Sequence, residues 1–466
     1  MTNAEAKRLE SEARSLNASG RNLEALALYR QIVSLAPNDP AAEHNLASAL
    51  AAAGQWREGE THIRRAFAKG IDAPQSWLLL ARCQQTLGFH DDAERAFLEA
   101  LKRKPNLYDA HRELAQLRWM READAAEALA LMDAAIQRNP GDLRLQVLKA
   151  QALDNMGQAD VAVELTRSLA AAHPHDPLVV TAAAQLAASA GDANEAVSLA
   201  ERAALLAPGG YIQESTLVTA CLAAGQAERA SKLAAALRQR APLDQHAIAM
   251  QATAWRLLGD ARYRTLYDYQ AFVVTDRLDT PAGWNSLASY LDDLATGLAS
   301  EHRLRTHPFD QSIRHGSQIH DVPNIDHPAV RALPEALNGA IMRYLNRLGR
   351  GGDPLRSRNT GKYAVHGMWS IRMSAGGHHV DHIHPDGWIS SACYVEMPKV
   401  RGEKEGWIKF GCPGVRTKPE LDAEHFIEPQ PGMLALFPSH MWHGTTRFSD
   451  KTPRMTVAFD IIPGPA

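Results

Sequence analysis

The sequence predicts a multidomain chain of α plus β class. An N-terminal all-α superhelix of repeats is followed by a C-terminal jelly roll with flanking helices. Three observations lead to this prediction. Glycines recur every 34 residues through the first half, and short strand-like runs punctuated by Gly and Pro fill the second half. A chain of 466 residues is also too long for one hydrophobic core. We expect the array to span residues 1–275 and the second domain residues 276–466.

The repeats appear as three ladders of residues in register. The glycine ladder steps by 34 residues, apart from one step of 69 that holds two repeats and one extra residue. Its members are Gly20, Gly54, Gly88, Gly157, Gly191, Gly225 and Gly259. The second ladder holds the small residues Ala25, Gly59, Ala93, Ala162, Ala196 and Ala230, and the third holds Pro37, Pro105, Pro140, Pro174, Pro208 and Pro242. The glycine ends the first helix of each pair, the small residue permits close helix packing, and the proline lies beyond the second helix. In the fourth unit Glu122 stands near the expected glycine.

These ladders resemble the tetratricopeptide repeat, whose period, small residues and closing proline they match. The resemblance implies about eight helix pairs stacked into a right-handed superhelix with a concave groove. Residues Trp255–Val274 lose the alanine-rich character and are expected to form the last helices and the junction. Grooves of this class bind peptides or proteins, so a protein or peptide partner is expected. The alternative is an array that only rigidifies or dimerises the chain.

Composition excludes several classes of function. The formal net charge of −3 and the lack of a basic stripe argue against nucleic acid as a partner. No run of eighteen apolar residues occurs and the N-terminus is polar, so no membrane association is expected. The scattered cysteines fit free thiols in a reducing compartment, and we expect a soluble, cytoplasmic protein. These cysteines are Cys83, Cys221, Cys393 and Cys412. No feature of the sequence specifies an oligomeric state.

After Pro281 the alanine-rich repeat pattern ends and the predicted secondary structure changes. Residues 284–300 and 328–348 are predicted to form helices. Five short strands follow between Gly/Pro turns, at residues 368–373, 389–397, 407–410, 433–437 and 454–462. Many short strands with turn punctuation are typical of a sandwich or jelly roll.

A cluster of histidines lies between the first two of these strands. Imidazoles two residues apart on a strand point the same way, and a third from a distant strand can close one face of a metal ion. His443 is the expected distal ligand. Arg454, eleven residues further on, has a forked guanidinium that suits a carboxylate, and Thr456 lies on the same strand face.

Three segments carry a second resemblance: His382-Ile-His-Pro-Asp-Gly-Trp-Ile-Ser-Ser-Ala-Cys-Tyr394, Pro431-Gly-Met-Leu-Ala-Leu-Phe-Pro-Ser-His-Met-Trp-His443, and Arg454-Met-Thr456. They resemble the 2-oxoglutarate/Fe(II) dioxygenase domain, and in particular the bacterial group in which it follows a tetratricopeptide array. The resemblance covers roughly residues 281–466 and implies a double-stranded β-helix fold. It also implies Fe(II), 2-oxoglutarate and O2 as cofactor and co-substrates, with Arg454, Thr456 and Tyr394 binding 2-oxoglutarate.

The proximal metal ligands remain open among three pairs. His379 with Asp381 and His384 with Asp386 are literal His-x-Asp pairs, whereas His382 with His384 matches the position that the resembled group uses. On a regular strand, residues 382, 384 and 386 share one face, and 379 and 381 the other. We favour His382 and His384, with Asp381 as the alternative carboxylate. An all-histidine set leaves the Fe(II) site with one more unit of net positive charge than a set that contains a carboxylate.

The remaining candidates have supporting roles. Trp369 and Ser390 are expected near the co-substrate, and His378 and Trp388 behind the ligands. The leading hypothesis is a dioxygenase that hydroxylates a protein or peptide docked by the array. The alternatives are a small-molecule oxygenase with a regulatory array, a non-catalytic scaffold with a degenerate jelly roll, and a cupin isomerase that does not use 2-oxoglutarate.

Overall fold

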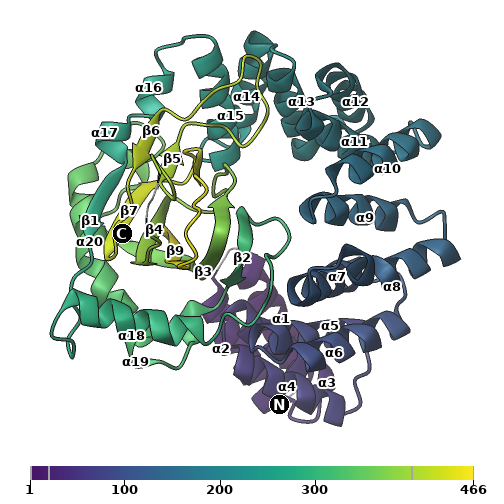
Figure 1. Ribbon diagram of the computed structural model, residues 1–466. Helices are drawn as coiled ribbons and strands as arrows, with labels where there is room; N and C mark the ends of the chain where they lie inside the picture. Colours follow the sequence, from purple (N-terminus) through teal and green to yellow (C-terminus); the bar gives the residue numbers. More distant parts are fainter. Residues whose placement is uncertain (1–2, 19–20, 400–401, 465–466) are drawn as a thin grey trace. The chain divides into compact units, whose positions relative to one another are not determined.

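A computed structural model of the protein describes residues 3–18, 21–399 and 402–464. The chain divides into two compact units (Figure 1). One consists of Met1–Trp119 with Asp124–Leu148, and the other of Met120–Ala123 with Lys149–Ala466. The second unit therefore contains the later repeats as well as the whole β-rich part. None of the helices in the described ranges is both long and apolar enough to cross a bilayer.

The predicted helical repeats are confirmed. Seven helix pairs run from α1 to α14, and α15 is followed by the much shorter α16. Their bounds are α1 (Asn3–Ala18), α2 (Asn22–Leu35), α3 (Pro40–Ala52), α4 (Trp56–Ala68), α5 (Pro74–Thr86), α6 (His90–Arg103), α7 (Tyr108–Glu122), α8 (Ala125–Arg138), α9 (Leu143–Asn155), α10 (Ala159–Ala172), α11 (Pro177–Ala190), α12 (Ala193–Leu206), α13 (Tyr211–Ala223), α14 (Ala227–Arg240), α15 (Gln245–Leu257) and α16 (Tyr263–Leu266). Each ladder proline follows the end of the second helix of a pair, as expected.

The ladder glycines adopt the left-handed conformation that ends each first helix. From Gly54 to Gly259 their φ values lie between 65° and 98°, while Gly20 lies outside the described residues. In the fourth pair Ala123 takes this conformation instead, with a φ of 59°. A side chain there is strained, because Cβ approaches the following carbonyl group.

Replacing Ala123 with glycine is therefore expected to stabilise the protein by about 0.5–1 kcal/mol, since glycine adopts positive φ without strain. Chemical denaturation would measure the change. The matched control is Ala53→Gly, at an equivalent helix end with a φ of −90°. It should destabilise by about the same amount, because glycine there only adds freedom to the unfolded chain. Equal effects of the two substitutions would contradict the prediction.

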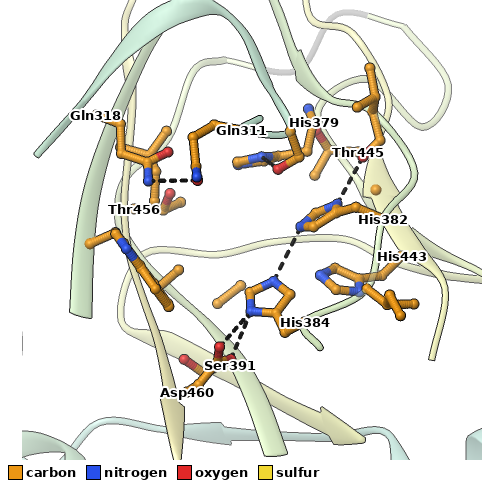
Figure 2. Close-up of a pocket in the computed structure, with 18 of the residues that line it drawn as sticks. Gln311, Gln318, His379, His382, His384, Ser391, His443, Thr445, Thr456 and Asp460 are labelled. Atoms are coloured by element: carbon orange, nitrogen blue, oxygen red, sulfur yellow. Dashed lines mark hydrogen bonds and ion pairs between the residues drawn. The ribbon is translucent and has the colours of Figure 1, made fainter. Parts of the chain in front are cut away.

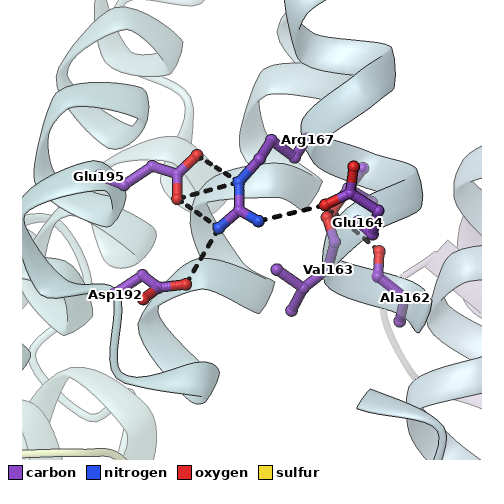
Figure 3. Close-up of polar contacts among 7 residues, drawn as sticks. Ala162, Val163, Glu164, Arg167, Asp192 and Glu195 are labelled. Carbon is purple, nitrogen blue, oxygen red and sulfur yellow. Dashed lines mark hydrogen bonds and ion pairs between the residues drawn. The ribbon is translucent and has the colours of Figure 1, made fainter. Parts of the chain in front are cut away.

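Neighbouring repeats are also joined by polar contacts. Arg167 of α10 donates to Glu195 of α12 at 2.7 Å and to Asp192, just before α12, at 3.0 Å (Figure 3). It also reaches Glu164 on its own helix at 3.3 Å. The hydrogen bond that Arg167 donates to Glu195, together with the negative charges around it, raises the pKa of the guanidinium. Because the group is exposed to solvent, salt should screen this contribution.

The β-rich part consists of two antiparallel sheets, which fits the predicted jelly roll. The larger has the order β1-β7-β4-β9-β3-β2 and the smaller β6-β5-β8. The bounds are β1 (Val274–Arg277), β2 (Ile313–Ile319), β3 (Tyr363–His379), β4 (Ile389–Glu396), β5 (Ile408–Phe410), β6 (His425–Ile427), β7 (Met433–Pro438), β8 (His443–Thr445) and β9 (Arg454–Pro463). Phe410 of the smaller sheet packs edge-on against Phe437 of the larger, with ring centroids 5.0 Å apart.

Helices flank the larger sheet, as predicted (Figure 1). They are α18 (Leu287–Ala299), which packs on β4, the short α19 (Pro328–Arg331), and α20 (Leu333–Leu348), which packs on β1 and β7. The junction after the array contains α17 (Tyr269–Phe272) and then β1, which pairs with β7. The predicted boundary between residues 275 and 276 thus falls within β1. Four strands, β1, β2, β6 and β8, were not foreseen, because three of them have only three or four residues.

His302 gives the folded protein a pH dependence. Its ring nitrogens lie 2.8 Å from Ser317 Oγ and 3.0 Å from Ser370 Oγ. Burial, and then the nearby Arg372, lower the pKa of His302 to about 4 from an ordinary value of 6.5. The unfolded chain therefore binds this proton more readily than the folded one.

The free energy of unfolding should consequently fall, by up to about 2–3 kcal/mol from this residue, as pH drops from about 6.5 to 4. Above pH 6.5 the residue should make no difference to the pH dependence. His302→Gln should flatten the profile, whereas the same change at the exposed His175 should not. Urea denaturation at several pH values would test this, and identical profiles for both variants would contradict it.

Candidate active site

The backbone brings two distant segments of the histidine cluster together. His382 N donates to His443 O at 2.9 Å, and His443 N donates to His382 O at 3.1 Å. The expectation of a regular strand through residue 386 is wrong, since this bridge stands alone and a turn follows at Pro385 and Asp386. Proline has no N–H to continue a ladder. His382 and His384 nevertheless both point inward.

The three imidazoles face one another (Figure 2). One ring nitrogen from each of His382, His384 and His443 lies within 4.8 Å of the others, and the two Nε2 atoms of His382 and His384 are 3.2 Å apart. In each ring Nδ1 is engaged by an oxygen acceptor: Val380 O at 2.8 Å for His382, Asp460 Oδ2 at 2.8 Å for His384 and Met441 O at 2.9 Å for His443. Since these oxygens only accept, Nδ1 carries the proton. In a neutral ring Nε2 then offers a lone pair, as a metal requires.

Electrostatics keeps two of these rings neutral. Burial, and then the neighbouring imidazole of His384, lower the pKa of His382 to about 3. Burial and the surrounding imidazoles likewise hold the pKa of His443 well below its ordinary value. Metal ligands must be deprotonated, so both residues are ready to bind at neutral pH.

Among the described residues, the carboxylates of the alternative pairs do not join the cluster of ligand atoms, although Asp386 lines the same cavity. Asp381 Oδ2 accepts a hydrogen bond from Lys409 Nζ at 2.7 Å. His379 Nδ1 lies 2.8 Å from Ser312 Oγ, and its ring centroid is 5.8 Å from that of His382. Across the described parts of the chain, the clustered ligand atoms belong to His382, His384 and His443, with neither Asp381 nor Asp386 among them.

Arg454 is a buried cation without an anionic partner. Only 2% of its surface is exposed, and Nη1 donates to Gly406 O at 3.0 Å. Its Nε has no partner, nor has the hydroxyl of Tyr394, whose ring centroid lies 5.3 Å from the guanidinium carbon. Within the described ranges no carboxylate pairs with Arg454. Burial lowers the pKa of Arg454 and raises that of Tyr394 to about 12, so the phenol keeps its proton. An unpaired buried charge is costly, which favours an anionic ligand here.

The three histidines and Arg454 line one cavity of about 690 Å³. This volume lies within the range of roughly 300–1,000 Å³ that is typical of ligand sites. Four residues of β9 with even numbers line it: Arg454, Thr456, Ala458 and Asp460. The three histidines and Trp369 also line it, whereas Tyr394 lies behind Arg454. Trp388 is a structural residue, because its Nε1 donates to Leu355 O at 2.8 Å.

The last helices of the array support the turn that presents His443. Tyr267, between α16 and α17, donates to His440 O at 2.9 Å and accepts from Trp442 N at 3.1 Å. Trp442 Nε1 donates to Thr253 of α15 at 2.9 Å. The residues just before the third histidine are therefore fixed by the repeats of the same unit.

Sequence reasoning missed several residues of this site. Asp460 had a usable signal, because it lies six positions after Arg454 and so on the same strand face. No pattern in the sequence pointed to Gln311 or Gln318. These two side chains hydrogen-bond to each other at 3.0 Å on another wall of the cavity. Asn155, at the end of α9, also lines the cavity, and no local pattern could reveal this long-range contact.

Comparison with known families agrees with this geometry. Residues 367–460 match a family model described as "Putative 2OG-Fe(II) oxygenase". Residues 16–83 and 120–186 match one model described as "Tetratricopeptide repeat", and residues 84–142 match another. No curated protein matches the chain.

Three solved structures resemble parts of the chain. A tetratricopeptide repeat protein from Parabacteroides merdae ATCC 43184 is 16% identical, with 53% of this chain and 98% of that chain covered and a TM-score of 0.38. MamA is 16% identical, with 33% of this chain and 89% of that chain covered and a TM-score of 0.28. PilW, a type IV pilus biogenesis factor, is 20% identical, with 45% of this chain and 96% of that chain covered and a TM-score of 0.34.

The matched oxygenase family implies Fe(II), 2-oxoglutarate and O2, and tetratricopeptide repeats generally mediate contacts between proteins. The three convergent imidazoles and the unpaired Arg454 fit a ferrous ion and an anionic co-substrate. The chain thus carries tetratricopeptide repeats in its N-terminal part and an oxygenase domain of the 2OG-Fe(II) family at its C-terminus.

Proposed function

We propose that this protein is an Fe(II)/2-oxoglutarate-dependent dioxygenase that hydroxylates a protein or peptide docked by its repeat array. One observation carries the proposal: ring nitrogens of three histidines converge in the cavity that also contains a buried guanidinium with no anionic partner among the described residues. The array is taken to span residues 1–275 and the catalytic domain residues 276–466. A cytoplasmic location belongs to the same proposal.

His382, His384 and His443 would hold Fe(II) on one face. When bound, Fe(II) and O2 supply the chemistry that couples decarboxylation of 2-oxoglutarate to oxidation of a C–H bond. The hydrogen bonds that the three Nδ1 atoms donate fix the orientation of each ring before the metal arrives.

Arg454 would anchor a carboxylate of 2-oxoglutarate. Its free Nε can donate to a carboxylate oxygen, and a guanidinium suits this geometry better than an ammonium does. Thr456 lines the same cavity and can donate its hydroxyl. Tyr394, which keeps its proton, has an unpartnered hydroxyl beside the guanidinium and would steady the bound anion.

A macromolecular substrate is supported by the place of Asn155. This residue ends α9 of the array and lines the same cavity as the histidines. It is fixed there, because Asp310 N donates to its Oδ1 at 2.7 Å and its side-chain amide donates to Asp310 Oδ1 at 3.2 Å. A segment bound along the array could therefore enter the cavity past Asn155.

Iron binding and co-substrate turnover test the proposal. The full chain should bind one Fe(II) and convert 2-oxoglutarate to succinate in an O2-dependent manner, weakly alone and faster with a hydroxylatable peptide. His443→Ala should abolish both activities, while His175→Ala, which alters an exposed histidine, should leave them unchanged. Failure of the wild-type chain to bind iron or to form succinate with O2 would refute the proposal.

The small-molecule alternative is favoured by the cavity volume of about 690 Å³. Trapping substrates from cell extract with the iron-loaded full chain separates the two. A protein that gains one oxygen atom supports the lead proposal. A small metabolite that is oxidised at the same rate in the presence of excess competing peptide supports the alternative.

A further inference from the structure

We infer that Asp460 is a positioning residue that gives the three-histidine site, through His384, the negative charge that a carboxylate ligand would otherwise bring. The inference rests on the proposed function. It concerns the net positive charge of the metal site. Three neutral imidazoles do not reduce the charge of the bound ion, whereas a carboxylate ligand would.

Asp460 is buried directly behind His384. It lies on β9 with 4% of its surface exposed, and its carboxylate is 2.8 Å from His384 Nδ1 (Figure 2). Throughout the described residues this carboxylate has no lysine or arginine partner. A buried carboxylate without a cation is costly on its own. A metal ion bound at Nε2 of His384 would provide the missing positive charge across the ring.

The carboxylate is also held in place from its other side. Ser390 Oγ donates to Asp460 Oδ1 at 2.7 Å and lies 2.9 Å from Ser439 Oγ, and both serines are fully buried. Gly387 closes the wall, because a Cβ at this position would come within 2.3 Å of Ser439 Oγ and 3.1 Å of Asp460 Cγ. The side chain therefore has little room to turn away from His384.

The other two histidines have no equivalent. Nδ1 of His382 and of His443 donates to a neutral backbone carbonyl group, whereas Nδ1 of His384 donates to a carboxylate. A charged acceptor strengthens the hydrogen bond and makes the imidazole a more basic ligand. His384 is thus set apart as the ligand with the greatest electron donation.

Co(II) binding to the full-length protein tests this without any need for turnover. Asp460→Asn keeps the shape and one acceptor oxygen but removes the charge. It should weaken Co(II) affinity about 10–100-fold, as loss of an outer carboxylate does at other metal sites. It should also shift the visible ligand-field bands. The matched control is Asp353→Asn, since Asp353 is a half-buried carboxylate that pairs with Arg356 and does not line the cavity. The Co(II) affinity and spectrum of this variant should stay unchanged.

The outcomes separate the two proposals. Absence of Co(II) and Fe(II) binding in the wild-type chain would refute the proposed function itself. Wild-type binding with equal affinity and an identical spectrum in Asp460→Asn would overturn the inference alone. If Asp460→Asn does not fold, Ser390→Ala decides the matter. It leaves the charge but frees the carboxylate, so affinity should fall about 3–10-fold, the effect of one hydrogen bond. An unchanged affinity and spectrum would overturn the inference.

Discussion

Arg454→Met is expected to abolish co-substrate binding while making the protein more stable. The guanidinium can give a carboxylate two charged hydrogen bonds, so 2-oxoglutarate affinity should fall about 100-fold or more. Methionine fills a similar volume without a charge, and Arg454 is 2% exposed with no anionic partner among the residues described. Its replacement should therefore raise the free energy of unfolding by about 1–3 kcal/mol.

Calorimetric titration with 2-oxoglutarate in the presence of Fe(II), without O2, would measure the first effect. Chemical denaturation of the metal-free protein would measure the second. The control is Arg447→Met, which removes an exposed arginine between β8 and β9 and should change neither quantity. If Arg454→Met bound 2-oxoglutarate normally and was less stable than wild type, Arg454 would be a structural residue and not a co-substrate anchor.

Tyr267→Ala is expected to damage the metal centre from the side of the array. The ring is 1% exposed and its hydroxyl holds both His440 and Trp442, immediately before His443. Loss of a buried aromatic side chain costs about 3–5 kcal/mol. Because the turn that carries His443 also loses its support, Fe(II) affinity should fall together with stability. Tyr267→Phe should show a smaller loss of both, about 1–3 kcal/mol in stability, because packing is kept.

Tyr29→Ala provides the comparison. Tyr29 is a buried aromatic residue of α2 in the other compact unit, with 6% of its surface exposed. Its loss should destabilise that unit to a similar degree but leave Fe(II) affinity unchanged. Melting curves and iron titrations of the three variants would show this. Equal iron affinity in Tyr267→Ala and wild type would mean that the turn before His443 does not depend on the array.

Further hydrogen bonds join the later repeats to the β-rich part. Arg256 of α15 donates to Gly411 O and Asp422 O, both at 2.8 Å, and Arg416 donates to Ser189 O at 2.7 Å. The later repeats are thus part of the fold that surrounds the site. Removing residues 1–250 would remove Ser189 and the start of α15, so lost activity in such a fragment would not by itself identify a substrate-docking role.

The repeat architecture was accessible from the sequence because each helix pair depends mainly on its own residues and its neighbours. The ladder glycines at the ends of first helices and the ladder prolines after second helices meet local requirements, and six of these glycines indeed adopt positive φ. The strand pattern was also local, but strands of three or four residues carry too little periodicity to be recognised. β1 and β8 exist because of their pairing with β7 and β5, which lie far away in the sequence.

Some features of the candidate site could likewise be predicted from local sequence, whereas others depend on long-range contacts. Spacing and residue chemistry were enough to predict a repeat array, a β-rich domain and a set of histidines with an arginine eleven residues beyond the last. Which side chains converge depends on how the whole chain folds. Lys409 engages Asp381, a bridge aligns His382 with His443, and Asp460 stands behind His384. Each of these contacts joins segments that are distant along the chain, and the free energy of such contacts depends on the packed fold and not on neighbouring residues.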